Sequence, residues 1–375
     1  MAATPEHVDA LQRVIDALVA PGASAVDTEG RYPREALDAL GEAGLLGMCS
    51  AADVGGGGLG LRAAADVVER LASVCGSTAM VVLMHYAATA LLDSTGPEAV
   101  RREIAAGRHL TTLAFSEAGS RSHFWAPQSA AVRSGQSVRL DAHKSWVTSA
   151  GQADSYVWSS RPMEAEGPMT LWLVPAGAEG LSVSGAFDGL GLRGNASMPM
   201  AAEAVTVPVG ALLGGDGAGL DLALSAVLPW FLVLNAAFSV GLMQAVIAET
   251  GDHLRATRLE HLGQTLAEQP LARVDHARMR LAADQAAALV QDALAALETG
   301  REDAMLLVLE VKAAAGEASI AVTDLAMKLC GGAAFRKELG IERRFRDARA
   351  ARVMAPTTDA LLDFIGRAIN GLPLL

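Results

Sequence analysis

The sequence predicts an α+β fold in which a helical block is followed by a β block and then by a second helical block. Apolar residues recur at helical spacing in the first and last parts of the chain, whereas short alternating runs fill the middle. The blocks are segregated, which excludes the strand–helix alternation of a Rossmann fold. We expect an N-terminal helical domain at 1–109, a middle antiparallel β domain at 110–212 and a C-terminal helical bundle at 213–375.

Composition narrows the class of protein. The chain has 375 residues, of which 51% are hydrophobic and 19% are charged, and this balance excludes a disordered chain. The net charge of −12 argues against nucleic-acid binding, which depends on basic patches. Three scattered cysteines and an N-terminus without an apolar core predict a cytoplasmic protein without disulfides.

The first block is expected to form helices at 6–20, 33–48 and 61–93, from the spacing of its apolar residues. A glycine-rich loop, Gly55–Gly60, separates the second helix from the third. The loop lacks the lysine of a phosphate-binding GxxxxGK[ST] motif, and no strand precedes it. It is therefore interpreted as a turn.

The middle block reads as an antiparallel β domain. Alternating runs at Val132–Leu140, Ser155–Ser160 and Leu171–Val174 are separated by Gly, Pro, Asp and Ser. Four of the five tryptophans fall in this block, where large amphipathic rings suit the half-buried face of a sheet: Trp125, Trp146, Trp158 and Trp172.

The last block is expected to form helices at 218–258, 268–298, 302–330 and 352–370. Within the first of them, residues 222–248 form a run of 27 without a charge. As one helix this run would span about 40 Å, which is long enough for a bilayer. Polar or helix-breaking residues interrupt it, and its flanks are acidic rather than basic. We expect it to be buried in protein rather than in lipid.

Five segments, taken in chain order, resemble stretches of one known family. They are Tyr32–Gly47 with its GGGGLGL loop, Phe115–Ser122 (compared with TEPGAGSD), Lys144–Ala150 (compared with KxWITNA), Gly191–Gly194 with Val205–Pro208 and Leu212–Gly214, and Cys330–Gly332 with Arg346–Arg349. Their order is similar to that of the acyl-CoA dehydrogenase family of flavoproteins, over almost the whole chain.

The resemblance implies a four-helix bundle as the C-terminal domain, assembly as a homodimer or homotetramer, and FAD as cofactor. It also implies an acyl thioester substrate, on CoA or on an acyl carrier protein, and an electron-transferring flavoprotein as a possible partner. The implied flavin contacts, with Arg258, Gly331 and Gly332 acting across a dimer, are Phe115, Ser116, Trp146, Thr148, Arg258, Gln269, Lys328, Gly331, Gly332 and Thr357. The implied substrate contacts are Ser122, His85 and Ala355. No HExxH or CxxC spacing predicts a metal site.

The chain departs from the family at the catalytic base. The family's YEGT motif carries a glutamate that removes the α-proton of the thioester, and the matching position here is Ala355. Some members place the base on the first bundle helix, which here reads Pro229–Val233 without an acid. Two replacements are considered: His123, which replaces a family aspartate, and Asp359, expected one helical turn after Ala355 on the same face.

Three kinds of function therefore stay open. The first is an FAD-dependent acyl-CoA or acyl-carrier-protein dehydrogenase-like oxidoreductase with a displaced or missing base. The second is different chemistry on the same fold, either a desulfinase or eliminase on an acyl thioester, or a flavin monooxygenase. The third is a non-catalytic partner subunit of a hetero-oligomer. The uncharged first bundle helix weakens the usual anchoring of CoA, so a carrier protein or a carrier-free substrate also stays open.

Overall fold

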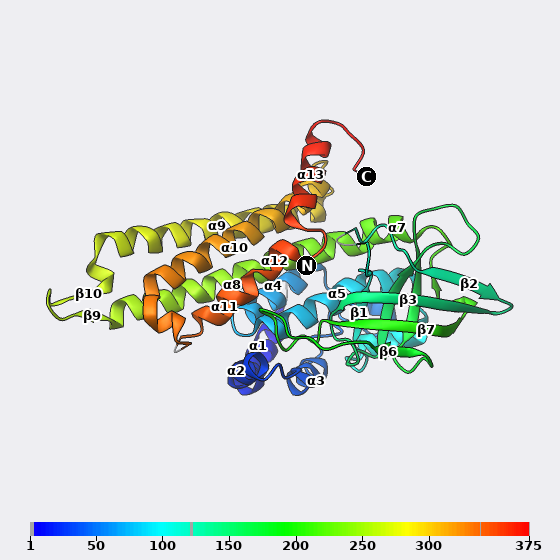
Figure 1. Ribbon diagram of the computed structural model, residues 1–375, viewed down its shortest axis with the longest axis horizontal. Helices are drawn as coiled ribbons and strands as arrows, with labels where there is room; N and C mark the ends of the chain where they lie inside the picture. The colour runs from blue at the N-terminus through cyan, green and yellow to red at the C-terminus, as the bar shows by residue number, and fades with distance from the viewer. Residues whose placement is uncertain (1–3, 121–122, 338, 375) are drawn as a thin grey trace. The chain divides into compact units, whose positions relative to one another are not determined.

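The computed structural model describes residues 4–120, 123–337 and 339–374, and Figure 1 shows the order of the elements. The chain forms two compact units. The first comprises residues up to Val67, Met80–Gly189 and Arg193–Phe231, and the second comprises Val68–Ala79, Leu190–Leu192 and the residues from Leu232 onward. The predicted α+β class is confirmed. The three predicted domain ranges stay predictions.

The N-terminal helices differ from their predicted lengths at glycines and turns. Their bounds are α1 (Pro5–Val14), a π-helical segment (Ile15–Val19), α2 (Ala20–Thr28), α3 (Arg34–Glu42), α4 (Leu61–Ala72), α5 (Gly76–Thr95) and α6 (Glu98–Ala105). The helix predicted to reach residue 48 ends at Glu42, because Gly44 adopts a φ of +74° that ends the helical path. The helix predicted at 61–93 is two helices, and α6 was not predicted.

Two four-stranded sheets form the β part of the first unit. One has the order β1 (Thr111–Ala114), β4 (Ser155–Ser160), β5 (Thr170–Pro175), β8 (Leu212–Leu213); the other has β2 (Ala130–Ser134), β3 (Ser137–Val147), β7 (Met198–Pro208), β6 (Leu181–Val183). All pairs are antiparallel except β1 with β4, which corrects the wholly antiparallel prediction. The single run predicted at Val132–Leu140 is a hairpin, because Gly135, with a φ of +65°, turns the chain between Ser134 and Ser137.

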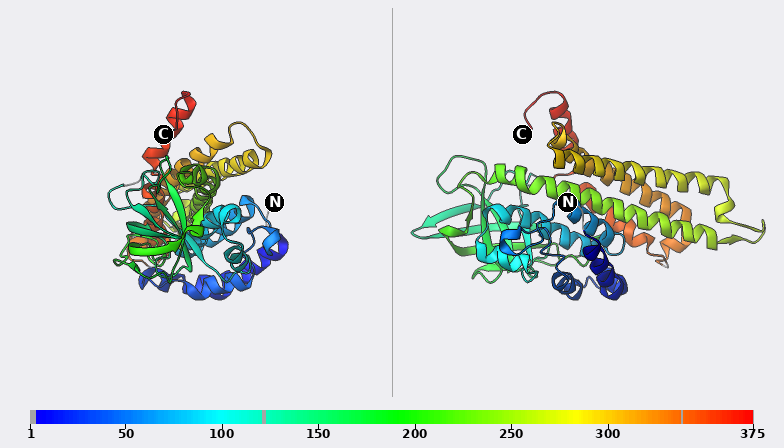
Figure 2. Two further views of the ribbon diagram at one scale, coloured as in Figure 1. Left: turned by 90° about the vertical axis from the view of Figure 1, so that its right-hand side faces the viewer. Right: turned by 180° about the vertical axis from the view of Figure 1, so that it is seen from behind.

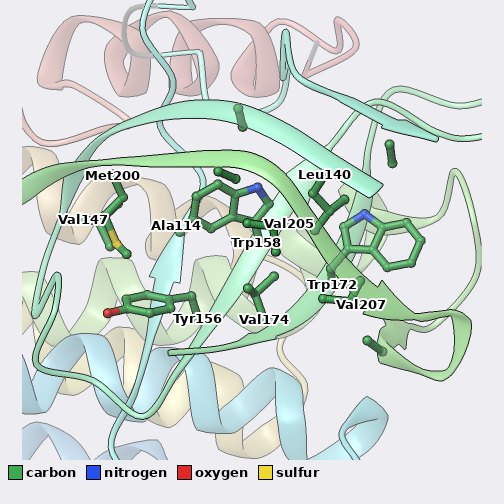
Figure 3. Close-up of a cluster of buried hydrophobic side chains, with 14 of the residues drawn as sticks. Ala114, Leu140, Val147, Tyr156, Trp158, Trp172, Val174, Met200, Val205 and Val207 are labelled. Carbon is green, nitrogen blue, oxygen red and sulfur yellow. The ribbon is translucent and has the colours of Figure 1, made fainter. Parts of the chain in front are cut away.

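The two sheets share one apolar core (Figure 3). Trp158 and Trp172 face each other across β4 and β5 and are 1% and 0% exposed. Val138, Val205 and Val207 enter the same core from the other sheet. The prediction of half-buried tryptophans is therefore wrong for this pair, since both rings lie between the two sheets rather than on one outer face.

The second unit is helical. It contains most of α8 (Leu228–Ala256), the hairpin β9 (Arg258–Leu259) and β10 (Gln264–Thr265), α9 (Pro270–Thr299), α10 (Ala304–Phe335), α11 (Ile341–Ala348), α12 (Ala350–Val353) and α13 (Thr358–Ile369). The long helices α8, α9 and α10 run side by side, as Figure 1 and the right view of Figure 2 show. Before α8, the first unit contains α7 (Gly219–Leu222) and a π-helical segment (Ala223–Val227), and it ends at Phe231 within the first turn of α8. The helix predicted at 352–370 is broken into α12 and α13, because Pro356 cannot continue a helical hydrogen-bond ladder.

The apolar helix is covered by protein. The segment Gly219–Ala256 is long and apolar enough to cross a membrane, yet 78% of its most apolar stretch is buried inside the protein. A Cβ on Gly241 would lie only 2.0 Å from the backbone oxygen of Glu69, so α8 touches the end of α4 directly. The Ile247 carbonyl accepts from His276 of α9, and Glu249 pairs with Arg344 of α11 at 2.6 Å.

Candidate functional site

The segment after β1 is joined to the far end of β3 by backbone hydrogen bonds. The N–H of Ser145 donates to the Ser116 carbonyl at 2.9 Å, and the N–H of Ala118 donates to the His143 carbonyl at 3.1 Å. Phe115 is buried and stacks on Phe124, with ring centroids 6.5 Å apart. These bonds bring Phe115 and Ser116 next to the stretch that carries Trp146 and Thr148, four residues that the resemblance had grouped.

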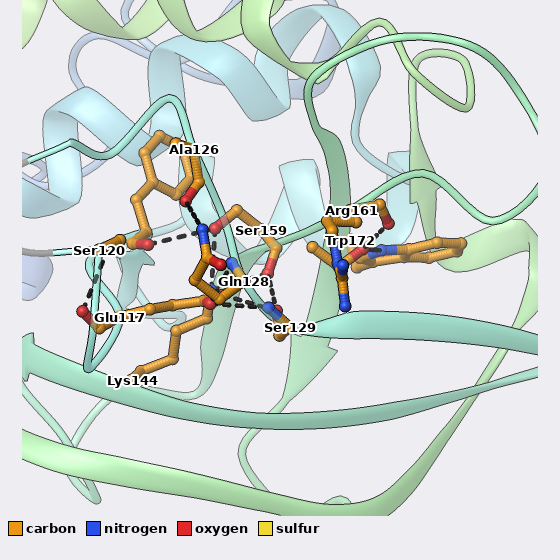
Figure 4. A network of polar contacts seen from close by, with 11 residues as sticks. Glu117, Ser120, Ala126, Gln128, Ser129, Lys144, Ser159, Arg161 and Trp172 are labelled. Carbon is orange, nitrogen blue, oxygen red and sulfur yellow. Dashed lines mark hydrogen bonds and ion pairs between the residues drawn. The ribbon is translucent and has the colours of Figure 1, made fainter.

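A buried ion pair holds this junction together (Figure 4). The Lys144 ammonium lies 2.5 Å from a Glu117 carboxylate oxygen and also donates to the carbonyl and the hydroxyl of Ser159. Glu117 accepts in addition from the N–H groups of Gln128 and Ser129 and from the Ser129 hydroxyl. The two side chains are 0% and 3% exposed.

The electrostatics of the pair follow from its burial. Burial pushes the pKa of Glu117 up, but the Lys144 charge and the hydrogen bonds outweigh it, so the pKa lies below its usual value. Burial lowers the pKa of Lys144 to about 8, against the attraction of Glu117. Both residues fall within the motifs quoted above, but the sequence does not pair them, because nothing in a spacing of 27 residues indicates contact.

Trp146 presents an exposed aromatic ring. It lies at an irregularity of β3, between Lys144 and Val147, and its φ is +57°. A non-glycine residue in this left-handed region costs about 1–2 kcal/mol. The side chain is 70% exposed and meets Phe187 edge-to-face at 6.5 Å. Such local strain at an exposed aromatic ring is a feature typical of binding sites.

The donor set in the first unit fits a flavin. An exposed planar indole offers a stacking surface, and the hydroxyls of Ser116 and Thr148 belong to the same junction. Thr148 is buried, and its hydroxyl shares a hydrogen bond of 3.1 Å with that of Ser197. An aromatic ring and hydroxyl groups on two hydrogen-bonded segments suit an aromatic ligand with a polar edge.

The hairpin after α8 carries Arg258 and leads to Gln269. Arg258 pairs with Thr265 across the hairpin and is 57% exposed on its side chain. Among the described residues, its guanidinium makes long contacts, 3.4 Å to the Gly263 carbonyl and 3.9 Å to Glu260. Gln269 donates to the Gln264 side chain at 2.8 Å. The Arg258 fork is therefore available to an anion such as a phosphate, which guanidinium groups bind well.

Lys328 and the two glycines lie on α10. The Lys328 ammonium is 2.7 Å from Asp275, so its charge is already neutralised by a carboxylate, which weakens a phosphate-binding role. This hydrogen bond is also the main cause that lowers the pKa of Asp275. Gly331 breaks the helix with a φ of +51°, and no atom lies within 4 Å of where a Cβ would stand at Gly331 or Gly332.

Ala355 lies between α12 and α13, in a segment that binds a buried lysine. The Lys312 ammonium donates to the carbonyls of Ala351, Met354 and Pro356 at 3.0, 3.0 and 2.8 Å. Burial lowers the pKa of Lys312 to about 7. Sequence reasoning missed this residue, although a lone lysine within an apolar helical stretch was a visible signal.

The structure corrects the placement of Asp359. Its prediction on the same helical face as Ala355 is wrong, because the break at Pro356 puts the two residues on different elements. Asp359 is exposed in the first turn of α13, where its charge favours the helix N-terminus. Thr357 caps that helix and accepts from the N–H of Ala360 at 3.4 Å. The Thr357 hydroxyl thus has a structural partner in this protein.

The histidines differ in environment. His85 is buried; its Nδ1 accepts from the Thr111 N–H, and its Nε2 donates to the Leu46 carbonyl, both at 3.2 Å. These bonds fix the neutral tautomer, and burial lowers the pKa of His85 to about 4. Both ring nitrogens are thus committed to backbone groups.

His123 is exposed and meets Trp125 edge-to-face at 4.9 Å, while its Nδ1 donates to the Ser120 carbonyl. Its Nε2 edge therefore remains accessible. Ser122, the neighbouring substrate residue in the prediction, lies outside the described residues. Within residues 4–120, 123–337 and 339–374, no three His, Cys, Asp or Glu side chains form a group that could hold a metal ion.

Comparison with known proteins gives a consistent result. Three family models match the chain: the acyl-CoA dehydrogenase N-terminal domain at residues 4–107, the middle domain at 112–205 and the C-terminal domain at 217–370. The mitochondrial short-chain specific acyl-CoA dehydrogenase of Bos taurus is 28% identical, over 90% of this chain and 83% of that protein.

Solved structures agree with these matches. Butyryl-CoA dehydrogenase from Megasphaera elsdenii has the same fold, with a TM-score of 0.91, 22% identity and 99% coverage of both chains. FkbI, described as serving biosynthesis of the methoxymalonyl extender unit of the Fk520 polyketide, has a TM-score of 0.86 and 26% identity, over 97% of this chain and 100% of that one.

Proposed function

The chain belongs to the acyl-CoA dehydrogenase family, and from this premise we propose that it is an FAD-dependent oxidoreductase of an acyl thioester that works without a carboxylate at the family's base position. The observation that supports this proposal is that position 355 holds an alanine. Ala355 lies in the loop between α12 and α13, and among the described residues the ionisable side chain that hydrogen-bonds to the carbonyls around it is Lys312.

The residues that would hold FAD fall into two sets. Trp146 offers the flat stacking surface, and Ser116 and Thr148, on the two segments that meet at this junction, offer hydroxyls. Arg258 offers a guanidinium for the pyrophosphate. When bound, FAD supplies the two-electron acceptor of the family's chemistry. The chain's own task is to fix the ring system and to bind the substrate.

The substrate carbonyl has a donor even though the base is absent. The N–H of Ala355 lies outside the hydrogen-bond ladders of both neighbouring helices. A backbone N–H at this point can bind the thioester oxygen and stabilise negative charge that develops there, an effect worth about 10²–10³-fold in rate for one donor. A positioned general base typically raises the reaction rate about 10²–10⁴-fold, and an alanine at this position cannot supply that increase.

This combination favours substrates that need carbonyl polarisation more than proton removal. Such a substrate carries an acidified α-position, or reaches its enolate by losing a leaving group. The uncharged run at 222–248 supplies no ionic anchor for CoA, and a relative with 26% identity serves an extender unit in polyketide biosynthesis. We therefore include acyl-carrier-protein thioesters in the substrate class beside acyl-CoA.

An anaerobic titration tests the proposal. The purified chain, with its flavin spectrum recorded, is mixed with a panel of acyl-CoA and acyl-carrier-protein thioesters. Bleaching of the flavin by one of them supports the proposal and identifies the carrier. Thioester turnover without bleaching would indicate an eliminase or desulfinase instead. Rapid oxygen uptake after chemical reduction, with no bleaching by any thioester, would indicate a monooxygenase. A chain that binds no FAD would refute the proposal and favour a non-catalytic subunit.

A further inference from the structure

Lys312 is a buried cation whose partners are backbone carbonyls. Its side chain is among the largest fully buried ones, with 1% exposure of the residue. Its three contacts, at 2.8–3.0 Å, all go to residues 351–356. In the part of the chain that the structure describes, no carboxylate pairs with it. A buried charge normally requires such a partner, so the three carbonyls must supply the compensation.

The geometry matches an ammonium rather than a neutral amine. An ammonium has three N–H donors, and three carbonyls accept from it. A neutral amine has two donors and a lone pair, which would face the third carbonyl. Hydrogen bonding of this kind favours the charged form, in opposition to burial. In this charged form Lys312 has no lone pair to act as a base.

The carbonyls that it binds lie on both sides of Ala355 in the chain. Ala351 belongs to α12, Met354 immediately follows that helix, and Pro356 precedes α13. Two of these carbonyls are therefore at a helix C-terminus, where a cation is favourable. Ala355 is the residue between the second and third contacts. The Met354 carbonyl and the Ala355 N–H belong to the same planar peptide group, so the hydrogen bond from Lys312 of α10 to that carbonyl restrains the plane of the N–H directly.

We propose that Lys312 is a positioning residue, which clamps the 351–356 segment so that the Ala355 N–H is held ready for a substrate carbonyl. The role of that N–H as a donor to the substrate rests on the proposed function, whereas the contacts of Lys312 with the 351–356 segment do not. The ammonium fixes the donor without taking part in proton transfer.

Two variants test the clamp in the full-length, FAD-loaded chain. Lys312→Met removes the three N–H donors and keeps a side chain of similar volume. If this variant does not fold, Lys312→Gln, which retains two N–H donors, takes its place. Lys337→Met serves as the control, since Lys337 is an exposed lysine just past the same helix. Amide hydrogen exchange is measured by peptide. We expect exchange at residues 351–358 to rise at least about tenfold in the Lys312 variants only. Unchanged exchange in these residues would overturn the clamp.

A second readout concerns the donor. The carbonyl stretch of a ¹³C-labelled thioester reports how strongly the protein polarises it, without requiring turnover. In Lys312→Met the stretch should move toward its value in free thioester, and kcat should fall on the order of 10²-fold while KM changes less than about twofold. A stretch identical to the wild type would overturn the positioning role. If the wild type binds no thioester at all, the proposed function and the donor role both fail, and hydrogen exchange alone decides the clamp.

Discussion

Removal of the Lys144 charge gives the sharpest test of how the β junction is held. Lys144→Met leaves Glu117 as a buried carboxylate without its counter-ion, and it removes two hydrogen bonds to Ser159. Breaking a buried pair by removing one partner costs about 3–5 kcal/mol. The amides of Gln128 and Ser129 still donate to Glu117, so we expect the lower end, about 3 kcal/mol. That is a large share of the total stability of a folded domain.

A double-mutant cycle measures this energy. The free energy of unfolding is measured with urea for Lys144→Met, Glu117→Gln and the double variant. The double variant should lose less stability than the two single variants lose together, by at least about 1 kcal/mol. Lys337→Met, at an exposed position, is the matched control and should change stability by less than about 0.5 kcal/mol. A loss below about 1 kcal/mol in Lys144→Met, or strict additivity, would refute the argument. Because the pKa of Glu117 is lowered in the folded chain, its contribution is present at neutral pH and is lost as the pH falls through the folded value.

Three further outcomes are expected. Ala355→Glu places a carboxylate at the family's base position, and flavin bleaching by acyl-CoA should accelerate by about 10²–10⁴-fold in stopped-flow absorbance; an unchanged rate would contradict a missing base. Trp146→Ala removes the exposed stacking surface and should lower the flavin-to-protein ratio after gel filtration, with Trp146→Phe intermediate, whereas equal ratios would exclude stacking. Because the pKa of His85 is lowered to about 4, the unfolded chain binds a proton that the folded chain does not between about pH 6.5 and 4. As the pH falls across this range, the free energy of unfolding should decrease by up to about 3 kcal/mol, and the decrease should be smaller in His85→Gln. The same pH dependence in the wild type and the variant would refute the assignment.

Local patterns predicted the element types well. The order of helical and β blocks follows from periodicity, and the predicted helix at 268–298 lies within two residues of α9. Errors arose where one residue interrupts a pattern. Gly135 turns an apparently single strand into a hairpin, and Pro356 divides an apparently single helix. Both residues are standard signals for such breaks, but the apolar periodicity on either side outweighed them in the prediction.

The candidate site was predictable where its members are close in sequence. Phe115 with Ser116, and Trp146 with Thr148, fall within short motifs that a family resemblance can align. The contacts of Lys312 span 39 to 44 residues, and no motif connects their two ends. Likewise, the exposure of Trp146 depends on a left-handed backbone at a strand irregularity, which its residue type disfavours. These features depend on tertiary packing, which a single sequence does not encode in any local pattern.

The uncharged run at 222–248 has a consequence for the synthesis of the chain. This run and the adjoining Glu249 leave the ribosome before their later partners exist, since His276 lies 29 residues beyond its contact at Ile247, and Arg344 lies 95 residues beyond Glu249. At about 5–20 residues per second, an apolar nascent segment waits several seconds for α11. During that interval it presents a surface that chaperones recognise and that other nascent chains can bind. Premature termination after α8 would therefore yield an aggregating fragment, and the yield of native protein depends on how quickly the last third of the chain follows.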